Sequence, residues 1–363
     1  PITVPITVPI TNGRFDQGIM AKVVTIRDVA RAAGVSPMTV SRVLNDRPDV
    51  SSSTRQHVQK VIDDLGYSPS VIARNLSQGR SSTIGIVSSG LEFYGPSRTL
   101  VGIERQANEL GYTLMVRLLH NPLDSRGERA LNELVANQVA GIIWAVAEIG
   151  DRREWLYGNL KDEMVPFVFL NIKPRSSTTA VSVDNRLGGQ LAATHLLQQG
   201  YQKIAIITGP DTWWEARQRE LGWRETLQKA RYKDLDRLRE RGDWTAASGH
   251  NGMVRLLQRE PDLEAVFVCN DSMALGALQA ALDYGRAVPD DLAIIGFDDI
   301  PESAYFTPPL TTIRQDLLEV GCRAVSLLHQ QLLARRKDEV LAAELSIVEP
   351  ELIVRKSSIK ESR

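Results

Sequence analysis

Polar and aromatic side chains stand directly after short apolar runs in the later part of this 363-residue sequence. From Thr83 onward, runs such as TIGIVS (83–88) and KIAIITG (203–209) alternate with helical patterns, and this alternation predicts parallel sheets with crossover helices. In such folds ligands bind beyond the carboxyl ends of the strands. This rule selects Ser89, Phe93, Tyr94, Pro96, Asn171, Asp211, Trp213, Trp214, Arg219, Trp244, Asn270, Asp271, Asp298 and Asp299.

The selected side chains combine carboxylates, amides, one guanidinium group and flat aromatic rings. This set suits a sugar, whose hydroxyl groups need paired donors and acceptors while its C–H face stacks on an aromatic ring. Each residue also has a purely structural interpretation. The alternatives are a turn cap at Asp298-Asp299, a helix cap at Asp271, a surface position for Arg219, and packing between lobes for Trp213 and Trp214.

The sequence carries none of the common enzyme motifs. It has no G-x-G-x-x-G after a strand, no P-loop and no G-x-S-x-G. Asp298 and Asp299 do not form an acid–base pair, because adjacent residues at a strand end point apart. The five histidines are scattered, and Cys269 and Cys322 lie in apolar runs, which is typical of buried reduced thiols. We therefore expect no catalytic residue, no metal site and no cofactor.

The segment VTIRDVARAAGVSPMTVSRVLN (24–45) predicts a helix-turn-helix. Thr25 is a good N-cap for a first helix, and Gly34 ends it because a left-handed C-cap favours a residue without Cβ. Ser36 caps a second helix that has Pro37 at its first position. A third amphipathic helix, from about Ser53 to Leu65, completes a small domain. Residues 20–80 carry nine basic and five acidic side chains, so this domain is basic and the remainder acidic.

In a helix-turn-helix, the first turns of the second helix enter the major groove of DNA. Here that helix presents Pro37, Met38, Thr39, Ser41 and Arg42 outward. The Arg42 guanidinium can donate two hydrogen bonds to a guanine, whereas Pro37 and Met38 offer apolar contact, for example to a thymine methyl group. A helical hairpin with no role in DNA binding is the alternative.

Four short motifs resemble the LacI/GalR family of transcriptional regulators: DVA (28–30), AGVS (33–36), TVSRVLN (39–45) and LGY (65–67). For the first domain, the resemblance implies DNA contacts by Ile26, Arg27, Ser36, Pro37, Met38, Thr39, Ser41, Arg42, Asn45 and Tyr67. It also implies a hinge helix within residues 68–80 that folds only on DNA. Ala73 would then lie over the minor groove and Leu76 would wedge between base steps. A plain interdomain linker is the alternative for this segment.

The resemblance extends over the rest of the chain, to about Ser357. It implies inducer-pocket roles for Ser89, Phe93, Pro96, Asn171, Arg219, Trp244, Asn270, Asp298 and Leu317, to which the strand-end rule adds Trp213. Asn171 and Leu317 depart from the family's galactoside-binding pattern, which has an aspartate and a phenylalanine there. Trp213 and Trp214 replace small residues. A bulkier glycoside, or an oligosaccharide that stacks on more than one tryptophan, is therefore as plausible as a galactoside.

The expected fold class is α/β: a three-helix helix-turn-helix DNA-binding domain with a hinge helix, then a two-lobed body like the periplasmic binding proteins, with parallel sheets and helices on both faces. The expected segments are a disordered leader (1–19), the DNA-binding domain (20–67), the hinge (68–80), the effector-binding and dimerisation domain (81–357) and a tail (358–363). We expect the amino-terminal lobe to comprise residues 81–182 and 313–338, and the carboxy-terminal lobe residues 183–312 and 339–357.

These features predict a repressor that a sugar inducer releases from palindromic operator DNA. The leader lacks a secretory pattern and no 18-residue apolar run exists, so we expect a cytoplasmic protein without membrane contact. The added heptad helix with which one member of the family forms tetramers is absent after residue 357, which favours a homodimer. A purine co-repressor is the alternative within the family. An enzyme and a periplasmic sugar-binding protein are the alternatives outside it.

Overall fold

The computed structural model describes residues 24–44, 46–67, 81–120, 126–149, 165–173 and 175–360. The chain forms two compact units, residues 1–80 and residues 81–363. Several expectations lie outside the described residues: the leader, the hinge helix with Ala73 and Leu76, and the DNA contact of Asn45.

The first unit contains three helices, α1 (Ile26–Ala32), α2 (Pro37–Leu44) and α3 (Ser52–Leu65). Thr25 and Asp28 form a capping box at the start of α1, and Gly34 follows its end with a φ of 64°. The Oγ of Ser36 accepts a hydrogen bond from the Thr39 N–H at 3.1 Å. The predicted helix-turn-helix is confirmed. Its core consists of Val29, Ala30, Ala33, Val40, Val43, Val58 and Ile62.

The second unit contains two lobes, each built on one sheet. The first sheet has the strand order β11-β5-β4-β3-β1-β2 and is parallel throughout. Its strands are β1 (Thr83–Ser88), β2 (Thr113–Leu118), β3 (Gly141–Ala145), β4 (Phe167–Leu170), β5 (Ala180–Val183) and β11 (Leu345–Val348). The helices of this lobe are α5 (Tyr94–Glu109), α6 (Arg126–Ala136) and α12 (Leu317–Arg335).

The second sheet has the order β12-β10-β9-β8-β6-β7, and only β12 runs antiparallel to its neighbour. Its strands are β6 (Ile204–Thr208), β7 (Arg239–Arg241), β8 (Ala265–Val268), β9 (Ala293–Asp298), β10 (Thr311–Arg314) and β12 (Glu351–Ile353). The helices are α8 (Asn185–Gln198), α9 (Trp214–Lys229), α10 (Ala246–Arg259) and α11 (Asp271–Asp283). Short 3-10 turns are η1 (Leu235–Leu238), η2 (Pro301–Tyr305) and η3 (Lys356–Ser358).

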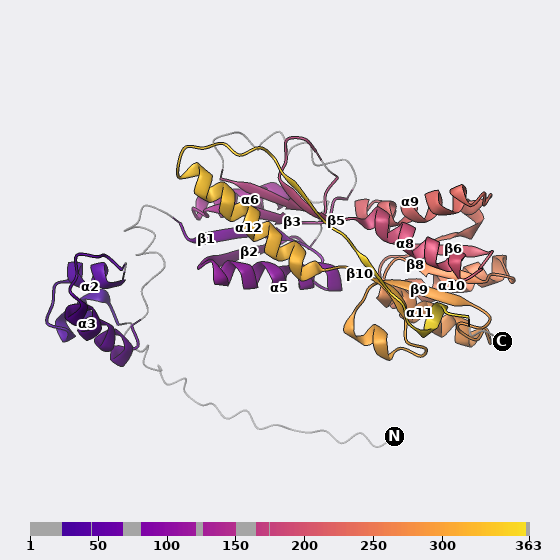
Figure 1. Cartoon of the computed structure of the whole chain (residues 1–363), viewed down its shortest axis with the longest axis horizontal. Helices are drawn as coiled ribbons and strands as arrows, with labels where there is room; N and C mark the ends of the chain where they lie inside the picture. The colour runs from indigo at the N-terminus through magenta and orange to yellow at the C-terminus, as the bar shows by residue number, and fades with distance from the viewer. Residues whose placement is uncertain are drawn as a thin grey trace, which may run out of the picture. The chain divides into compact units, whose positions relative to one another are not determined.

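Both faces of the first sheet are covered, as a parallel sheet requires. Along β1, Ile84 and Ile86 join the cluster under α5 and α12, whereas Val87 joins the cluster under α6. This alternation follows from the two-residue period of a strand. Figure 1 shows α12 and α5 beside the first sheet, and α8 to α11 around the second.

The chain passes between the lobes three times within residues 175–360: after β5, after β10 and between β11 and β12. The expected lobe boundaries need correction at all three passes. Residue Val183 was expected to begin the second lobe, but it ends β5 in the first sheet. Residues 345–348 were expected in the second lobe, but β11 pairs with β5 in the first sheet. Residues 313–314 were expected in the first lobe, but they lie on β10 in the second sheet. The second pass begins only at Gln315 because β10 stays paired with β9 through Arg314.

None of the helices in the described part of the chain is long and apolar enough to cross a membrane.

Candidate functional site

The outer face of α2 carries the residues expected to contact DNA. Met38 is 63% exposed, which is unusual for a large apolar side chain and suits contact with a base edge. Arg42 lies 3.4 Å from Asp49 in an ion pair whose two side chains are each about half exposed. Such surface pairs contribute only about 0–1 kcal/mol, so the pair leaves the Arg42 guanidinium available to DNA.

The other residues of the first unit that were expected to contact DNA differ in exposure. Arg27, Ser36 and Pro37 are exposed. Ile26 and Tyr67 are half-buried and pack against the core of the three helices, so their side chains also have a structural role. The hydroxyl groups of Ser36 and Thr39 lie 2.9 Å apart and are partly used in capping α2. Ser41 is half-buried.

A cavity of about 920 Å³, which includes space open to solvent, lies between the two lobes of the second unit. Ten residues were expected there, and nine line the cavity: Phe93, Pro96, Asn171, Trp213, Arg219, Trp244, Asn270, Asp298 and Leu317. The tenth, Ser89, is buried and does not line it. The cavity thus lies at the carboxyl ends of the strands, where the strand-end rule predicted a site.

Further lining residues were not singled out from the sequence. They are Glu92, Gly95, Thr99, Ala145, Val146, Ala147, Leu170, Glu215, Ser272 and Gln315. Glu215 was missed although it lies in the first turn of α9, two residues after Trp213, which the strand-end rule selected. Gln315 was missed because it follows β10, which the sequence did not reveal.

Arg219 is the buried cation of the cavity. Its side chain projects from α9 and is only 8% exposed. Its Nε donates to Asn185 Oδ1 at 2.8 Å, and its Nη1 donates to the carbonyl of Cys269. The guanidinium lies 3.7 Å from the ring centroid of Phe297, a distance at which cation–π attraction operates. These contacts hold Arg219 in one orientation before any ligand arrives.

Asp298 is the buried acceptor opposite this cation. Its Oδ1 lies 3.8 Å from Arg219 Nη1 and accepts a hydrogen bond of 2.6 Å from Gln315 Nε2. Burial raises the pKa of Asp298 to about 6, against the opposing effects of Arg219 and Gln315. Asp298 is therefore ionised at neutral pH with remaining acceptor capacity, as recognition of a hydroxyl group requires.

Trp244 forms a flat wall of the cavity. A Cβ on Gly209 would lie 2.2 Å from the Trp244 ring, so only glycine lets the ring rest against this strand end. The Asn270 side-chain amide donates to the Trp244 carbonyl at 3.1 Å. The Trp244 Nε1 is buried and has no hydrogen-bond partner among the described residues.

Left-handed backbone conformations recur around the cavity. Asn171, Trp244 and Asp298 have φ values of 49°, 76° and 118°. Non-glycine residues in such conformations cost on the order of 1–3 kcal/mol each and occur often at functional sites. Three cavity-lining residues share this property, which indicates that the surrounding structure fixes their side chains in place.

The residue that caps α11 is not the one expected from the sequence. Asp271 was expected to cap the next helix, but Asn270 caps it: Asn270 Oδ1 accepts from the Met273 N–H at 2.8 Å. Asp271 is fully buried, and accepts from the Thr312 hydroxyl at 2.6 Å and the Ile300 N–H at 2.9 Å. The expectation was wrong because the carboxylate of Asp271 lies against β10, which was not predicted.

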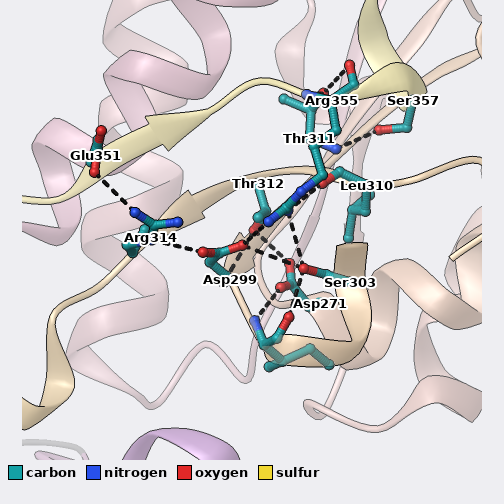
Figure 2. Close-up of polar contacts among 11 residues, drawn as sticks. Asp271, Asp299, Ser303, Leu310, Thr311, Thr312, Arg314, Glu351, Arg355 and Ser357 are labelled. Carbon is teal, nitrogen blue, oxygen red and sulfur yellow. Dashed lines mark hydrogen bonds and ion pairs between the residues drawn. The ribbon is translucent and has the colours of Figure 1, made fainter. Parts of the chain in front are cut away.

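Asp298 and Asp299 point apart, as expected for neighbours at a strand end. Asp299 turns away from the cavity to Arg314 and Arg355, whose nitrogens lie 2.7 and 2.6 Å from its oxygens (Figure 2). Arg314 also reaches Glu351 on β12 at 3.4 Å. Asp299 thus fixes the loop after β9 against β10 and the segment after β12, while Asp298 stays free to face the cavity.

The cavity can therefore bind a neutral, hydroxyl-rich molecule that has an apolar face. It offers a fixed cation, an ionised acceptor and several aromatic walls. No group of three histidine, cysteine or carboxylate side chains within the described ranges is placed to hold a metal ion.

Comparison with known proteins gives two family matches. Residues 25–70 match the family described as bacterial regulatory proteins, lacI family, and residues 193–358 match a periplasmic binding protein-like domain. The lactose operon repressor of Escherichia coli (strain K12) is 33% identical over 85% of each chain. The HTH-type transcriptional repressor PurR of Mannheimia succiniciproducens is 35% identical over 92% of this chain and 98% of its own. A crystal structure of the lac repressor dimer bound to operator and the anti-inducer ONPF aligns with a TM-score of 0.82, at 30% identity, over 93% of this chain and all of that chain.

Proposed function

Since the chain belongs to the lacI family of bacterial regulatory proteins, whose members compared above are repressors, we propose that it is a transcriptional repressor that a sugar releases from its operator. In this proposal, α2 reads operator DNA and the cavity between the lobes binds the inducer. The protein acts in the cytoplasm, where the DNA is, and needs no cofactor.

One observation carries the proposal of a sugar: a guanidinium, a carboxylate and a flat indole line the same cavity. Arg219 lies 3.8 Å from Asp298 and 5.5 Å from the Trp244 ring centroid. A pyranose presents hydroxyl groups that pair with the first two and a C–H face that stacks on the third. All three side chains are already held by protein contacts, so binding a sugar would order little and displace mainly water.

A purine effector is the second candidate, because a relative named PurR is 35% identical to this chain. A purine would also stack on Trp244 and pair with Asp298. The two candidates have opposite effects, since a co-repressor strengthens operator binding and an inducer weakens it. A sugar inducer is therefore expected to weaken operator binding, whereas a purine co-repressor is expected to strengthen it.

The proposed mechanism is a population shift between two conformations, which differ in how the lobes are arranged. In one conformation the first units of a dimer can bind two half-sites of a palindromic operator. The sugar binds the other conformation more tightly, and it can shift the equilibrium only by that difference in affinity. A dimer is proposed because the lac repressor structure that aligns with this chain is a dimer on its operator.

A ligand screen followed by operator titration tests the proposal. Monosaccharides, disaccharides and purines are first screened for a rise in melting temperature of the full chain, because a bound ligand stabilises the folded state by mass action. Each hit is then added to an operator titration at fixed salt. A sugar that raises the melting temperature and weakens operator binding supports the proposal. A purine that strengthens operator binding, with no sugar active, overturns it.

A further inference from the structure

The loop before α9 joins the two lobes at the rim of the cavity. Trp213 forms an antiparallel β-bridge with Ile149, which follows β3 in the first lobe. The Trp214 N–H donates to the carbonyl of Glu148 at 3.0 Å. The Glu148 carboxylate in turn accepts from the Lys173 N–H, which anchors this side of the contact to the segment after β4. We call the contact of Glu148 and Ile149 with Trp213 and Trp214 the rim bridge.

The rim bridge supplies what the start of α9 lacks. Trp213 is the N-cap residue of α9 and makes no capping hydrogen bond with its side chain. The first N–H groups of a helix have no partner within the helix, so they need an acceptor from elsewhere. Glu148 provides one from the opposite lobe. Separation of the lobes at this edge would leave the Trp214 N–H without its acceptor. The rim bridge therefore favours the arrangement in which the two lobes are in contact at this edge.

The side chain of Trp213 lines the cavity beside its backbone bridge. Its ring stands edge-on to Trp244, with 5.8 Å between centroids and 70° between planes. On its other side it stands edge-on to Phe93 of the first lobe, at 6.3 Å and 89°. The cavity therefore has two aromatic walls at a steep angle to each other. Trp244 lies near Arg219 and Asp298, whereas Trp213 lies toward the rim bridge.

We propose that Trp213 forms a second subsite of the cavity, which takes the second ring of a disaccharide whose first ring occupies the Arg219–Asp298–Trp244 end. This inference rests on the proposed sugar effector. A single pyranose that pairs with Arg219 and Asp298 leaves the Trp213 wall exposed to water. A second ring covers that wall and removes apolar surface from water, which adds affinity. It also contacts the residue whose backbone joins the lobes.

This position gives the second ring a role in induction as well as in binding. A ligand shifts a conformational equilibrium only if it contacts the two arrangements differently. The first subsite lies mainly on the second lobe, whereas Trp213 contacts both lobes through the rim bridge and Phe93. A disaccharide should consequently weaken operator binding more than the matching monosaccharide does at saturation.

Two matched variants of the full chain test the subsite. Trp213→Ala removes the wall, and Trp214→Ala removes the adjacent indole, which does not line the cavity, while each keeps the backbone N–H groups. The Kd of a methyl glycoside, of the disaccharide found to bind in the ligand screen and of the matching aryl glycoside is measured by calorimetry for each protein. A Trp213→Phe variant keeps a smaller ring and guards against loss of fold, which a melting curve checks.

The expected result is a disaccharide preference of about tenfold or more over the methyl glycoside, which corresponds to about 1.4 kcal/mol. Trp213→Ala should abolish this preference, Trp213→Phe should retain part of it, and Trp214→Ala should retain it in full. The aryl glycoside could also be preferred over the methyl glycoside as strongly as the disaccharide is, with that preference lost in Trp213→Ala. The subsite would then accept any ring, which overturns its restriction to a sugar. A preference that survives in Trp213→Ala overturns the subsite altogether. A wild-type protein that binds none of these sugars contradicts the proposed function instead, so the two failures are distinguishable.

Discussion

At the scale of the residue, Asp298 connects pH to the cavity between the lobes. Burial raises the pKa of this carboxyl to about 6 in the folded protein, whereas an aspartate in an unfolded chain titrates near about 3.9. Between these values the folded state binds more protons than the unfolded state. The contribution of Asp298 to the free energy of unfolding therefore falls as the pH rises from about 4 to about 6 and stays low above that.

Asp298→Asn should remove this dependence. Relative to the wild type, the variant should gain stability between pH 4 and pH 7, by up to about 3 kcal/mol if the whole pKa difference is expressed. Urea unfolding of both proteins across this pH range measures the gain. Sugar binding should respond oppositely: wild-type affinity should fall as the pH drops below about 6, because protonation removes an acceptor, and the variant should bind weakly throughout. A stability difference that does not change with pH would contradict the role assigned to Asp298.

Individual residues were predictable to the extent that their strands were. Trp213, Trp244 and Asp298 were found because each follows a run that reads as a strand end. Gln315 escaped because β10 is only four residues long and begins with two threonines. Thr311 and Thr312 are fully buried, and their hydroxyl groups bond to Arg355, Ser358 and Asp271. Buried threonines with such partners cannot be told from surface threonines without the tertiary structure.

At the scale of the element, the long helices and most strands were predictable, whereas β5, β10, β11 and β12 were not. The run at 83–88 coincides with β1, because its apolar residues are buried on both faces. β11 and β12 lie at the edges of their sheets and are largely exposed, so their apolar patterns are weak. They form because the chain returns through both lobes, a long-range constraint that no local pattern contains.

The helix caps of the first unit offer a test at this scale. Ser51 caps α3, and its Oγ accepts from the Thr54 N–H at 3.2 Å. Ser51→Ala should lower the free energy of unfolding of this unit by about 1 kcal/mol, because the N–H loses its partner. Ser52→Ala is the matched control: it lies one residue further on, inside the helix, where alanine is the better helix former. A thermal melt followed at the helical signal compares them, and equal melting temperatures would argue against the cap.

The second helix, α2, offers a test of DNA reading. Arg42→Ala should cost roughly 1–3 kcal/mol of specific operator binding and relax the preference at one base pair, if its guanidinium contacts a guanine. The exposed Arg31 on α1 is the control, since its replacement by alanine should change affinity little and base preference not at all. Binding to a set of single-base operator variants measures both. An unchanged base preference in the Arg42 variant would refute direct reading by this side chain.

At the scale of the whole molecule, the proposed sugar and the operator must act on each other symmetrically. If sugar binding weakens operator binding by some factor, saturating operator must weaken sugar binding by the same factor, because both are one coupling free energy. Such couplings are typically about 1–3 kcal/mol, or about 5–150-fold. Operator titrations with and without saturating sugar give one factor, and sugar titrations with and without saturating operator give the other. All are made at one salt concentration, because binding to DNA depends steeply on salt.

A non-operator duplex is the control in these titrations. It binds mainly through phosphates, so it should weaken sugar binding less than the operator does. Two equal factors for the operator would establish that the cavity and the DNA-binding unit share one equilibrium. Unequal factors would mean that the sugar also binds elsewhere on the protein or the DNA. If each ligand instead strengthens the binding of the other by the same factor, the effector is a co-repressor. The rim bridge would then belong to the DNA-bound arrangement.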